Sequence, residues 1–204
     1  MGLVGALAIA AWLTIGSELK TAYGRLAVAG TILAVLAAGR VPFASAYLKV
    51  GNLSLGLGIG LGGFTLFGVL ATLQHRSMGI EGATIRRLLP WILLFVFTNG
   101  FMEELWFRAL FLGPLSTLLG PAVAMILTAA VFALAHIGAS YMSGQERIRF
   151  LLILFPLGLV WGAAMYVTGS LLASALFHAG ADLLIVNGFV ASLHGKRSGS
   201  LCES

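Results

Sequence analysis

Seven long apolar stretches dominate this chain, separated by short clusters of charged and turn-forming residues. They cover residues 1–16, 26–46, 51–74, 88–112, 119–137, 150–168 and 171–190. Several approach the ~20 apolar residues with which a helix crosses a bilayer, and the first is short. With hydrophobic residues at 59% and charged residues at 9%, the chain has too little polar surface to cover a soluble globule of 204 residues. The sequence therefore predicts an all-α, polytopic transmembrane bundle of about seven hydrophobic helices in contact with membrane lipid.

The basic residues between these stretches predict the orientation in the membrane. Nine Lys and Arg residues fall in alternate connections and the C-terminal tail, against two on the opposite side. The nine are Lys20, Arg25, Arg76, Arg86, Arg87, Arg147, Arg149, Lys196 and Arg197, and the two are Arg40 and Lys49. Because cytoplasmic connections carry the excess of positive charge, we expect a multi-pass integral membrane protein with its N-terminus outside and its C-terminus in the cytoplasm.

The net charge of +5 does not indicate a nucleic-acid partner. The Lys and Arg residues are scattered between apolar runs, with no basic block and no basic patch interleaved with aromatic residues. The sequence also contains no repeat, soluble domain or low-complexity linker, so residues 1–204 are predicted to form a single transmembrane domain.

Glycines in the third stretch predict close helix packing. The segment GLGIGLGG at residues 56–63 contains two small-xxx-small spacings, Gly56 with Gly60 and Gly58 with Gly62. Such spacings let helix backbones approach closely in lipid. A nucleotide-binding loop is disfavoured, because neither a preceding strand nor a following Lys-Ser/Thr is predicted.

Ionisable residues inside the apolar stretches are few, and they carry most of the functional information. They are Glu103, Glu104, Arg108, His136, His178 and Asp182. A charged side chain near the bilayer centre costs on the order of 2.5–3.5 kcal/mol on insertion scales. A single histidine of this kind is more often a core hydrogen-bonder, but six such groups on three segments indicate a functional site.

The two carboxylates in the stretch FMEELWFR, residues 101–108, are predicted to have different roles. Residues four apart share a helix face, so Glu104 is predicted to pair with Arg108 one turn later. Glu103 projects about 100° away and has no partner in its own segment. We therefore expect Glu104 to be held in place and Glu103 to be free to act as a base.

Two later segments add further polar faces. In FALAH, Phe132 and His136 lie on one face, with the phenyl ring one turn from the imidazole. In SALFHAGAD, the residues Ser174, His178 and Asp182 form a stripe along a helix otherwise made of Leu, Phe, Ala and Gly. In a membrane such faces turn inward, which predicts a buried cavity containing carboxylates and two imidazoles.

The three motifs resemble those of a known family. They read E-E-x-x-x-R at Glu103, Glu104 and Arg108, F-x-x-x-H at Phe132 and His136, and H-x-x-x-D at His178 and Asp182. In this order on successive hydrophobic helices, they resemble the CAAX protease and bacteriocin-processing (Abi) family, whose eukaryotic relatives are the Ras-converting CAAX endopeptidases. The resemblance covers about residues 88–190, which would carry the catalytic core, whereas the first three helices match only in being hydrophobic.

The resemblance implies an intramembrane endopeptidase acting on a peptide or protein substrate that is prenylated or associated with the membrane. By similarity, Glu103 would activate a water molecule with help from His136. His178 and the residue at position 182 would stabilise the oxyanion or complete the water site. Amide hydrolysis requires a base, a proton donor to the amine and an oxyanion stabiliser, and these groups can supply all three.

Glu104 and Arg108 are implied to shape the cavity and to balance its charge. The same residues leave other classes open: a proton-coupled transporter, which would also place Glu, His and Asp inside a bundle, and a non-catalytic immunity or scaffold protein of the same family. The absence of sequence symmetry between the halves of the chain disfavours a transporter, and the intact set of acids and bases disfavours a loss of catalysis.

Position 182 departs from the pattern of the family, which commonly has Asn there. An ionised Asp182 cannot donate to an oxyanion, so it would orient His178, carry a proton or bind a metal ion. His136, His178 and Asp182 are the right ligand types for Zn²⁺, but the sequence has no H-E-x-x-H. We favour catalysis by glutamate without a cofactor and keep Zn²⁺ as the alternative.

Straight helices do not bring these motifs to one depth. Counted along simple spans at 1.5 Å per residue, Glu103 and His178 fall toward the outer half, whereas His136 falls near the cytoplasmic end. Proline removes a donor and disfavours helix before it. We therefore predict helix breaks or a re-entrant turn at Gly113–Pro114 and Gly120–Pro121.

Overall fold

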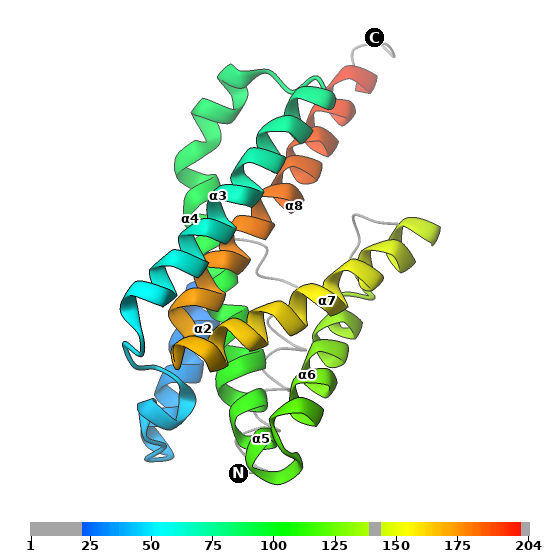
Figure 1. Cartoon of the computed structure of the whole chain (residues 1–204). Coiled ribbons are helices and arrows are strands. Elements are labelled where there is room, and N and C mark those ends of the chain that lie inside the picture. Colours follow the sequence, from blue (N-terminus) through cyan, green and yellow to red (C-terminus); the bar gives the residue numbers. More distant parts are fainter. Residues whose placement is uncertain (1–21, 139–143, 201–204) are drawn as a thin grey trace.

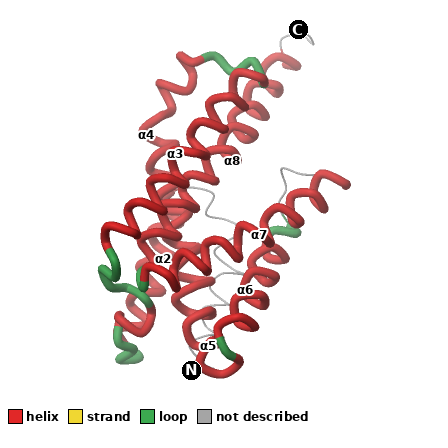
Figure 2. The backbone as a smooth tube through the Cα atoms, in the orientation of Figure 1, coloured by secondary structure: helices red, strands yellow, loops and turns green. Residues whose placement is uncertain are grey.

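The computed structural model describes residues 22–138 and 144–200, and all regular structure within them is helical (Figures 1 and 2). The elements are α2 (Ala22–Ala38), η1 (Phe43–Ala46), α3 (Leu53–Ser77), α4 (Gly82–Glu104), η2 (Leu105–Leu112), α5 (Gly113–Leu119), α6 (Pro121–Ala135), α7 (Gly144–Thr168) and α8 (Leu171–Ser200). The predicted first helix, residues 1–16, lies outside the described residues. The all-α prediction is confirmed for the described part of the chain.

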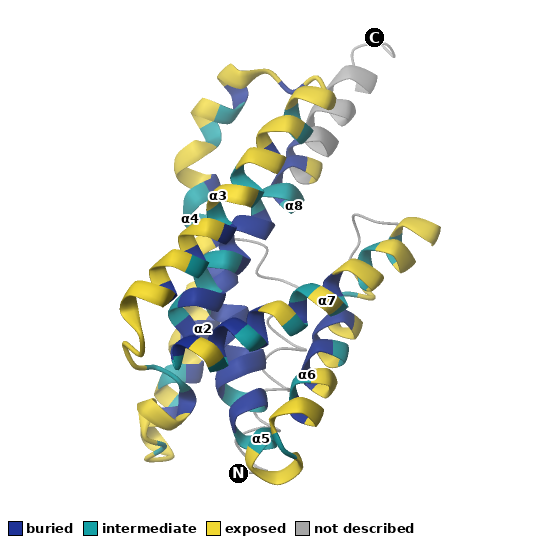
Figure 3. Cartoon of the chain, in the orientation of Figure 1, coloured by how far each residue is buried: buried dark blue, intermediate teal, exposed yellow. Residues whose placement is uncertain are grey.

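Four helical segments are long and apolar enough to cross a membrane: Leu53–Ser77, Gly82–Leu119, Gly144–Thr168 and Leu171–Gly188. Two apolar helices, Gly24–Ala38 and Pro121–Ala135, are shorter. Large apolar side chains are exposed on the outer faces of α3, α6 and α7, as lipid contact requires (Figure 3). These features indicate a multi-pass membrane protein.

Small residues let α3, α4 and α8 pack closely. Helices α3 and α8 run side by side in Figure 1, and α4 packs against α8. A Cβ atom at Gly60 would lie 2.8 Å from the Cβ of Leu176, and one at Gly180 would lie 2.5 Å from the Cα of Phe64. Gly58 and Gly62 have nothing within 4 Å of such an atom. The predicted close packing is therefore confirmed at Gly60. It is wrong for Gly58 and Gly62, which face away from the bundle.

Gly180→Ala is expected to destabilise the protein, because the nearest atom to the new methyl group belongs to backbone that cannot turn aside. Overpacking of this kind typically costs ~1–3 kcal/mol. Gly58→Ala is the matched control, since its methyl group meets nothing within 4 Å. Thermal unfolding in detergent should show a lower melting temperature for Gly180→Ala alone, and equal melting of the two variants would disprove the close approach of α3 and α8.

The long helix that contains the E-E-x-x-x-R motif ends later than predicted. Helical structure continues from Gly82 to Leu119 through Gly113 and Pro114, so the predicted break at that pair is wrong. A wider π-helical turn, η2, precedes Pro114 and admits its ring near the start of α5. The predicted break at Gly120–Pro121 is confirmed, because Gly120 has φ +79° and α6 begins at Pro121.

The stretch predicted at residues 26–46 is not a single helix. Helix α2 begins at Ala22 and ends at Ala38, followed by a turn with Arg40 at φ 51° and then by η1. Arg25, which was predicted to lie in a connection, therefore lies on α2.

Candidate active site

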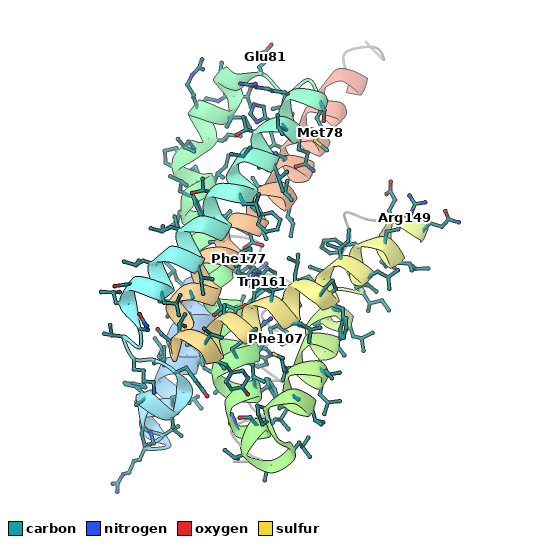
Figure 4. All side chains as sticks on the ribbon, viewed as in Figure 1. Met78, Glu81, Phe107, Arg149, Trp161 and Phe177 are labelled. Atoms are coloured by element: carbon teal, nitrogen blue, oxygen red, sulfur yellow. The ribbon has the colours of Figure 1, made fainter. Side chains whose placement is uncertain are left out.

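Two helical hairpins bring the motifs to one level. Glu103 lies 17 residues before Gly120, and His136 lies 16 residues after it, so the hairpin at Gly120 sets them at equal height. His178 lies nine residues after Gly169, and Trp161 lies eight residues before it, so the turn between α7 and α8 does the same. Figure 4 shows Trp161 well inside the bundle, away from the end of α7 that carries Arg149. The hairpins remove the mismatch in depth that straight spans would create.

Glu104 is the centre of a buried network. Its Oε1 lies 3.1 Å from Nη1 of Arg108 and 2.8 Å from Nδ1 of His178. The contact to Nη1 is an ion pair whose angles do not make a hydrogen bond. The two side chains of this pair are 0% and 1% exposed, so the predicted pairing of Glu104 with Arg108 is confirmed.

The guanidinium of Arg108 is fixed from three further sides. Its Nη2 donates to the Gly158 carbonyl of α7 at 3.0 Å. Its Cζ lies 5.0 Å from the ring centroid of Phe132 and 5.5 Å from that of Trp161, distances at which a cation is attracted to an aromatic face. Arg108 thus joins η2 to α6 and α7.

The π-helical segment η2 starts directly after Glu104 and carries Arg108. The spacing of the sequence motif predicts regular α-helix here. Short π-helical turns inside α-helices are frequent at functional sites. Here the segment passes through the most buried part of the chain, with Leu105 and Leu112 fully buried.

Glu103 faces both histidines. Its Oε2 lies 3.5 Å from Nε2 of His178 and 3.8 Å from Nε2 of His136. This oxygen is buried and has no hydrogen-bond partner within the described residues. The structure therefore brings Glu103, His136 and His178 together from α4, the end of α6 and α8.

The orientation of His136 is set by its own helix. It caps α6, and its Nδ1 lies 2.9 Å from the carbonyl oxygen of Phe132. Because a carbonyl can only accept, Nδ1 carries the proton, and Nε2 is left to face Glu103. The phenyl ring of Phe132 lies 4.7 Å from the imidazole of His136 and 5.6 Å from that of His178, as centroid distances, so the predicted aromatic neighbour is confirmed.

Asp182 lies at the edge of the cluster. Its Oδ1 is 3.8 Å from Nε2 of His178, and its Oδ2 accepts a hydrogen bond of 2.9 Å from Nδ2 of Asn99. Ser174, the third member of the polar stripe on α8, donates to the carbonyl of Leu171 at 3.0 Å. Its hydroxyl group is thus bound within its own helix.

Asn99 and Trp161 are two members of the site that the sequence analysis missed. Asn99 lies one turn before Glu103 on α4, and that spacing would have identified it had amides been considered with the ionisable residues. The indole of Trp161 stacks on the imidazole of His178 with centroids 3.9 Å apart and planes at 7°. Only the hairpin between α7 and α8 reveals this contact, since the two residues belong to different helices.

His136, His178 and Asp182 are the candidate metal ligands. Within residues 22–138 and 144–200, no group of three or more His, Cys, Asp and Glu side chains is arranged to hold one. These three side chains therefore do not fit as a zinc site in this geometry.

Buried carboxylates and imidazoles inside a bundle of apolar helices mark a functional site in a membrane protein, and groups of these types can transfer protons. Residues 85–184 match the family described as type II CAAX prenyl endopeptidase Rce1-like. These residues therefore form a domain of that family, as the sequence motifs predicted. All six ionisable residues of the cluster lie within the matched range. Neither the comparison with curated proteins nor that with solved structures found a match.

Proposed function

We propose that this protein is an intramembrane endopeptidase that hydrolyses a peptide bond with a water molecule activated by Glu103. The observation that carries the proposal is the environment of Glu103: its buried Oε2 lacks a hydrogen-bond partner within the described residues and faces two imidazole nitrogens. A carboxylate so placed can accept a proton from water. The water oxygen then forms a bond with the peptide carbonyl carbon.

His136 assists this proton transfer. Because its Nδ1–H donates to the carbonyl of Phe132, the neutral ring keeps a lone pair on Nε2. That lone pair can orient the same water molecule. The proton taken by Glu103 passes to the amine as the C–N bond breaks, either directly or through Nε2 of His136. This transfer restores the carboxylate of Glu103.

His178 stabilises the negative charge on the substrate oxygen. Glu104 accepts its Nδ1–H, and Trp161 stacks on its ring, so the imidazole has little freedom to rotate. With Nε2 protonated, His178 donates toward the oxyanion that forms next to Glu103. Glu104 and Arg108 hold this arrangement and balance its charge, while Asp182 and Asn99 complete the edge of the water site.

The substrate is a peptide or protein that is prenylated or associated with the membrane, in keeping with the description of the matched family. The distribution of basic residues supports an N-terminus outside and a C-terminus in the cytoplasm. Residues 1–204 act as one transmembrane domain of about seven helices, with the catalytic core in residues 88–190.

Proteoliposomes distinguish hydrolysis from transport. The purified protein is reconstituted with membrane-associated peptides outside the vesicles and a pH-sensitive dye inside. We expect peptide fragments without peptide-dependent acidification of the lumen. Acidification with all peptides left intact would favour a proton-coupled transporter and contradict the proposal.

Asp182→Asn separates water activation by Glu103 from metal catalysis. If no metal takes part, we expect this variant to retain or increase its cleavage rate, because an amide supplies the donor that an ionised carboxylate lacks. Elemental analysis should then find no stoichiometric metal. An inactive variant that has also lost about one zinc ion per chain, present in the parent, would overturn the mechanism.

A further inference from the structure

A groove runs along α3, on a different side of the helix from the glycines that pack against α8. Its volume is about 480 Å³. The residues that line it recur three and four positions apart, so they follow one side of α3. They are Phe64, Thr65, Gly68, Val69, Thr72, Leu73 and Arg76. None of them belongs to the catalytic cluster, and Figure 3 shows exposed residues all along this helix.

The lining of the groove is apolar except at one end. At the other end, the ring of Phe64 stacks on that of Phe97 of α4, with centroids 5.3 Å apart and planes at 9°. Between the two ends, the Thr72 hydroxyl donates to the Gly68 carbonyl at 2.8 Å. This hydroxyl is therefore satisfied within α3, and most of the groove suits a hydrocarbon chain.

Arg76 supplies the polar end of the groove. It is exposed in the last turn of α3 and takes part in no ion pair within residues 22–138 and 144–200. Figure 4 shows Met78, two residues later, at the far end of α3 from the turn that leads to Leu53. The twelve residues from Phe64 to Arg76 span about 18 Å, close to the ~15 Å of hydrocarbon in one leaflet of a bilayer.

This arrangement places a guanidinium at the level of the lipid headgroups. A guanidinium binds a phosphate with two parallel N–H···O bonds. The connection after α3 holds Arg76, Arg86 and Arg87, and the positive-inside rule assigns it to the cytoplasmic side, where anionic lipids give the membrane its negative surface potential. A neutral lipid would complement the apolar lining alone, whereas an anionic lipid complements the charge as well.

We propose that the groove on α3 binds a phospholipid with an anionic headgroup. One acyl chain lies along the apolar lining from Leu73 to Phe64, and the headgroup is held by Arg76. The lipid binds the folded protein and therefore stabilises it. This binding is independent of the proposed peptidase function, because it uses a different helix face and no catalytic residue.

Photolabelling locates the lipid directly. The purified protein is placed in phosphatidylcholine nanodiscs that contain a small fraction of phosphatidylglycerol with a photoreactive acyl chain, and labelled peptides are identified by mass spectrometry. We expect label within residues 64–76, displaced by unlabelled phosphatidylglycerol and not by the same amount of added phosphatidylcholine. Arg76→Gln should require roughly fivefold more labelled lipid for the same yield, which is the contribution of one basic residue at a membrane surface.

Arg87→Gln is the matched control for charge. Arg87 is exposed near the start of α4, carries the same charge at the same connection and does not line the groove. It should be labelled as the parent is. An equal loss of labelling in the two variants would mean diffuse attraction to the basic connection, and the proposal would be overturned. If Arg76→Gln fails to fold, the competition on the parent decides, since equal displacement by the two lipids shows ordinary lipid contact without a site.

A second pair of variants tests the groove itself. Thr72→Phe fills the lining, whereas Leu66→Phe enlarges a residue that is 55% exposed on α3 and outside the groove. Thr72→Phe should lose both the labelling and the rise in melting temperature that phosphatidylglycerol gives the parent, and Leu66→Phe should keep both. Unchanged labelling of Thr72→Phe would overturn the proposal. A parent that shows no label in α3 and forms a dimer by light scattering, with Thr72→Phe a monomer, would assign this face to a second copy of the chain instead.

Discussion

Glu103→Gln is expected to lower kcat for peptide cleavage by a factor of about 10²–10⁴, which is the contribution typical of a general base. The amide of glutamine keeps the shape of the side chain but cannot take a proton from water. Because Oε2 of Glu103 has no hydrogen-bond partner within the described residues, the change breaks no existing bond to that oxygen. The melting temperature in detergent should therefore stay close to that of the parent.

Glu81→Gln is the control for this experiment. Glu81 precedes α4, is exposed, and makes no capping hydrogen bond with its side chain. Glu81→Gln removes the same charge just before the start of α4 without touching the cluster, so cleavage should continue at the rate of the parent. Undiminished hydrolysis by Glu103→Gln would show that another group activates water.

Arg108→Ala is expected to lower the free energy of unfolding by ~3–5 kcal/mol and to abolish activity. Removing one member of a buried ion pair leaves the other charge without compensation, and here that charge is the fully buried carboxylate of Glu104. The substitution also removes the donor to the Gly158 carbonyl and the cation between Phe132 and Trp161. Thermal and denaturant unfolding in detergent measure the loss.

A double variant separates charge from packing. Glu104→Gln combined with Arg108→Leu removes both charges, fills part of the space and keeps an acceptor for Nδ1–H of His178. We expect part of the stability to return without the activity. Melting of Arg108→Ala at the temperature of the parent would mean that the Glu104–Arg108 pair contributes little.

The sequence was sufficient to predict the helical bundle and the members of its charged cluster. Long apolar stretches leave a chain no other way to satisfy its backbone in lipid, and charges inside them are too costly to be kept without a role. The pairing of Glu104 with Arg108 followed from spacing alone, since both lie on one segment. What could be predicted were the properties of single helices.

The features that could not be predicted from the sequence are the positions where the chain reverses and the contacts between side chains of different helices. Gly113–Pro114 and Gly120–Pro121 look alike as sequence, yet only Gly120 adopts the positive φ that reverses the chain, because the π-helical turn before Pro114 accommodates its ring. The stacking of Trp161 on His178 and the bond from Asn99 to Asp182 join different helices. Periodicity within one segment contains no information on such contacts.

The most direct test of the central claim is mass spectrometry of a membrane-associated peptide incubated with the purified protein in water enriched in ¹⁸O. Hydrolysis by activated water predicts two fragments whose masses sum to that of the peptide plus one water, with ¹⁸O in the new carboxyl group. Glu103→Gln should yield neither fragment, whereas Glu81→Gln should yield both. A peptide that stays intact with the folded parent, or fragments formed equally by Glu103→Gln, would contradict the account.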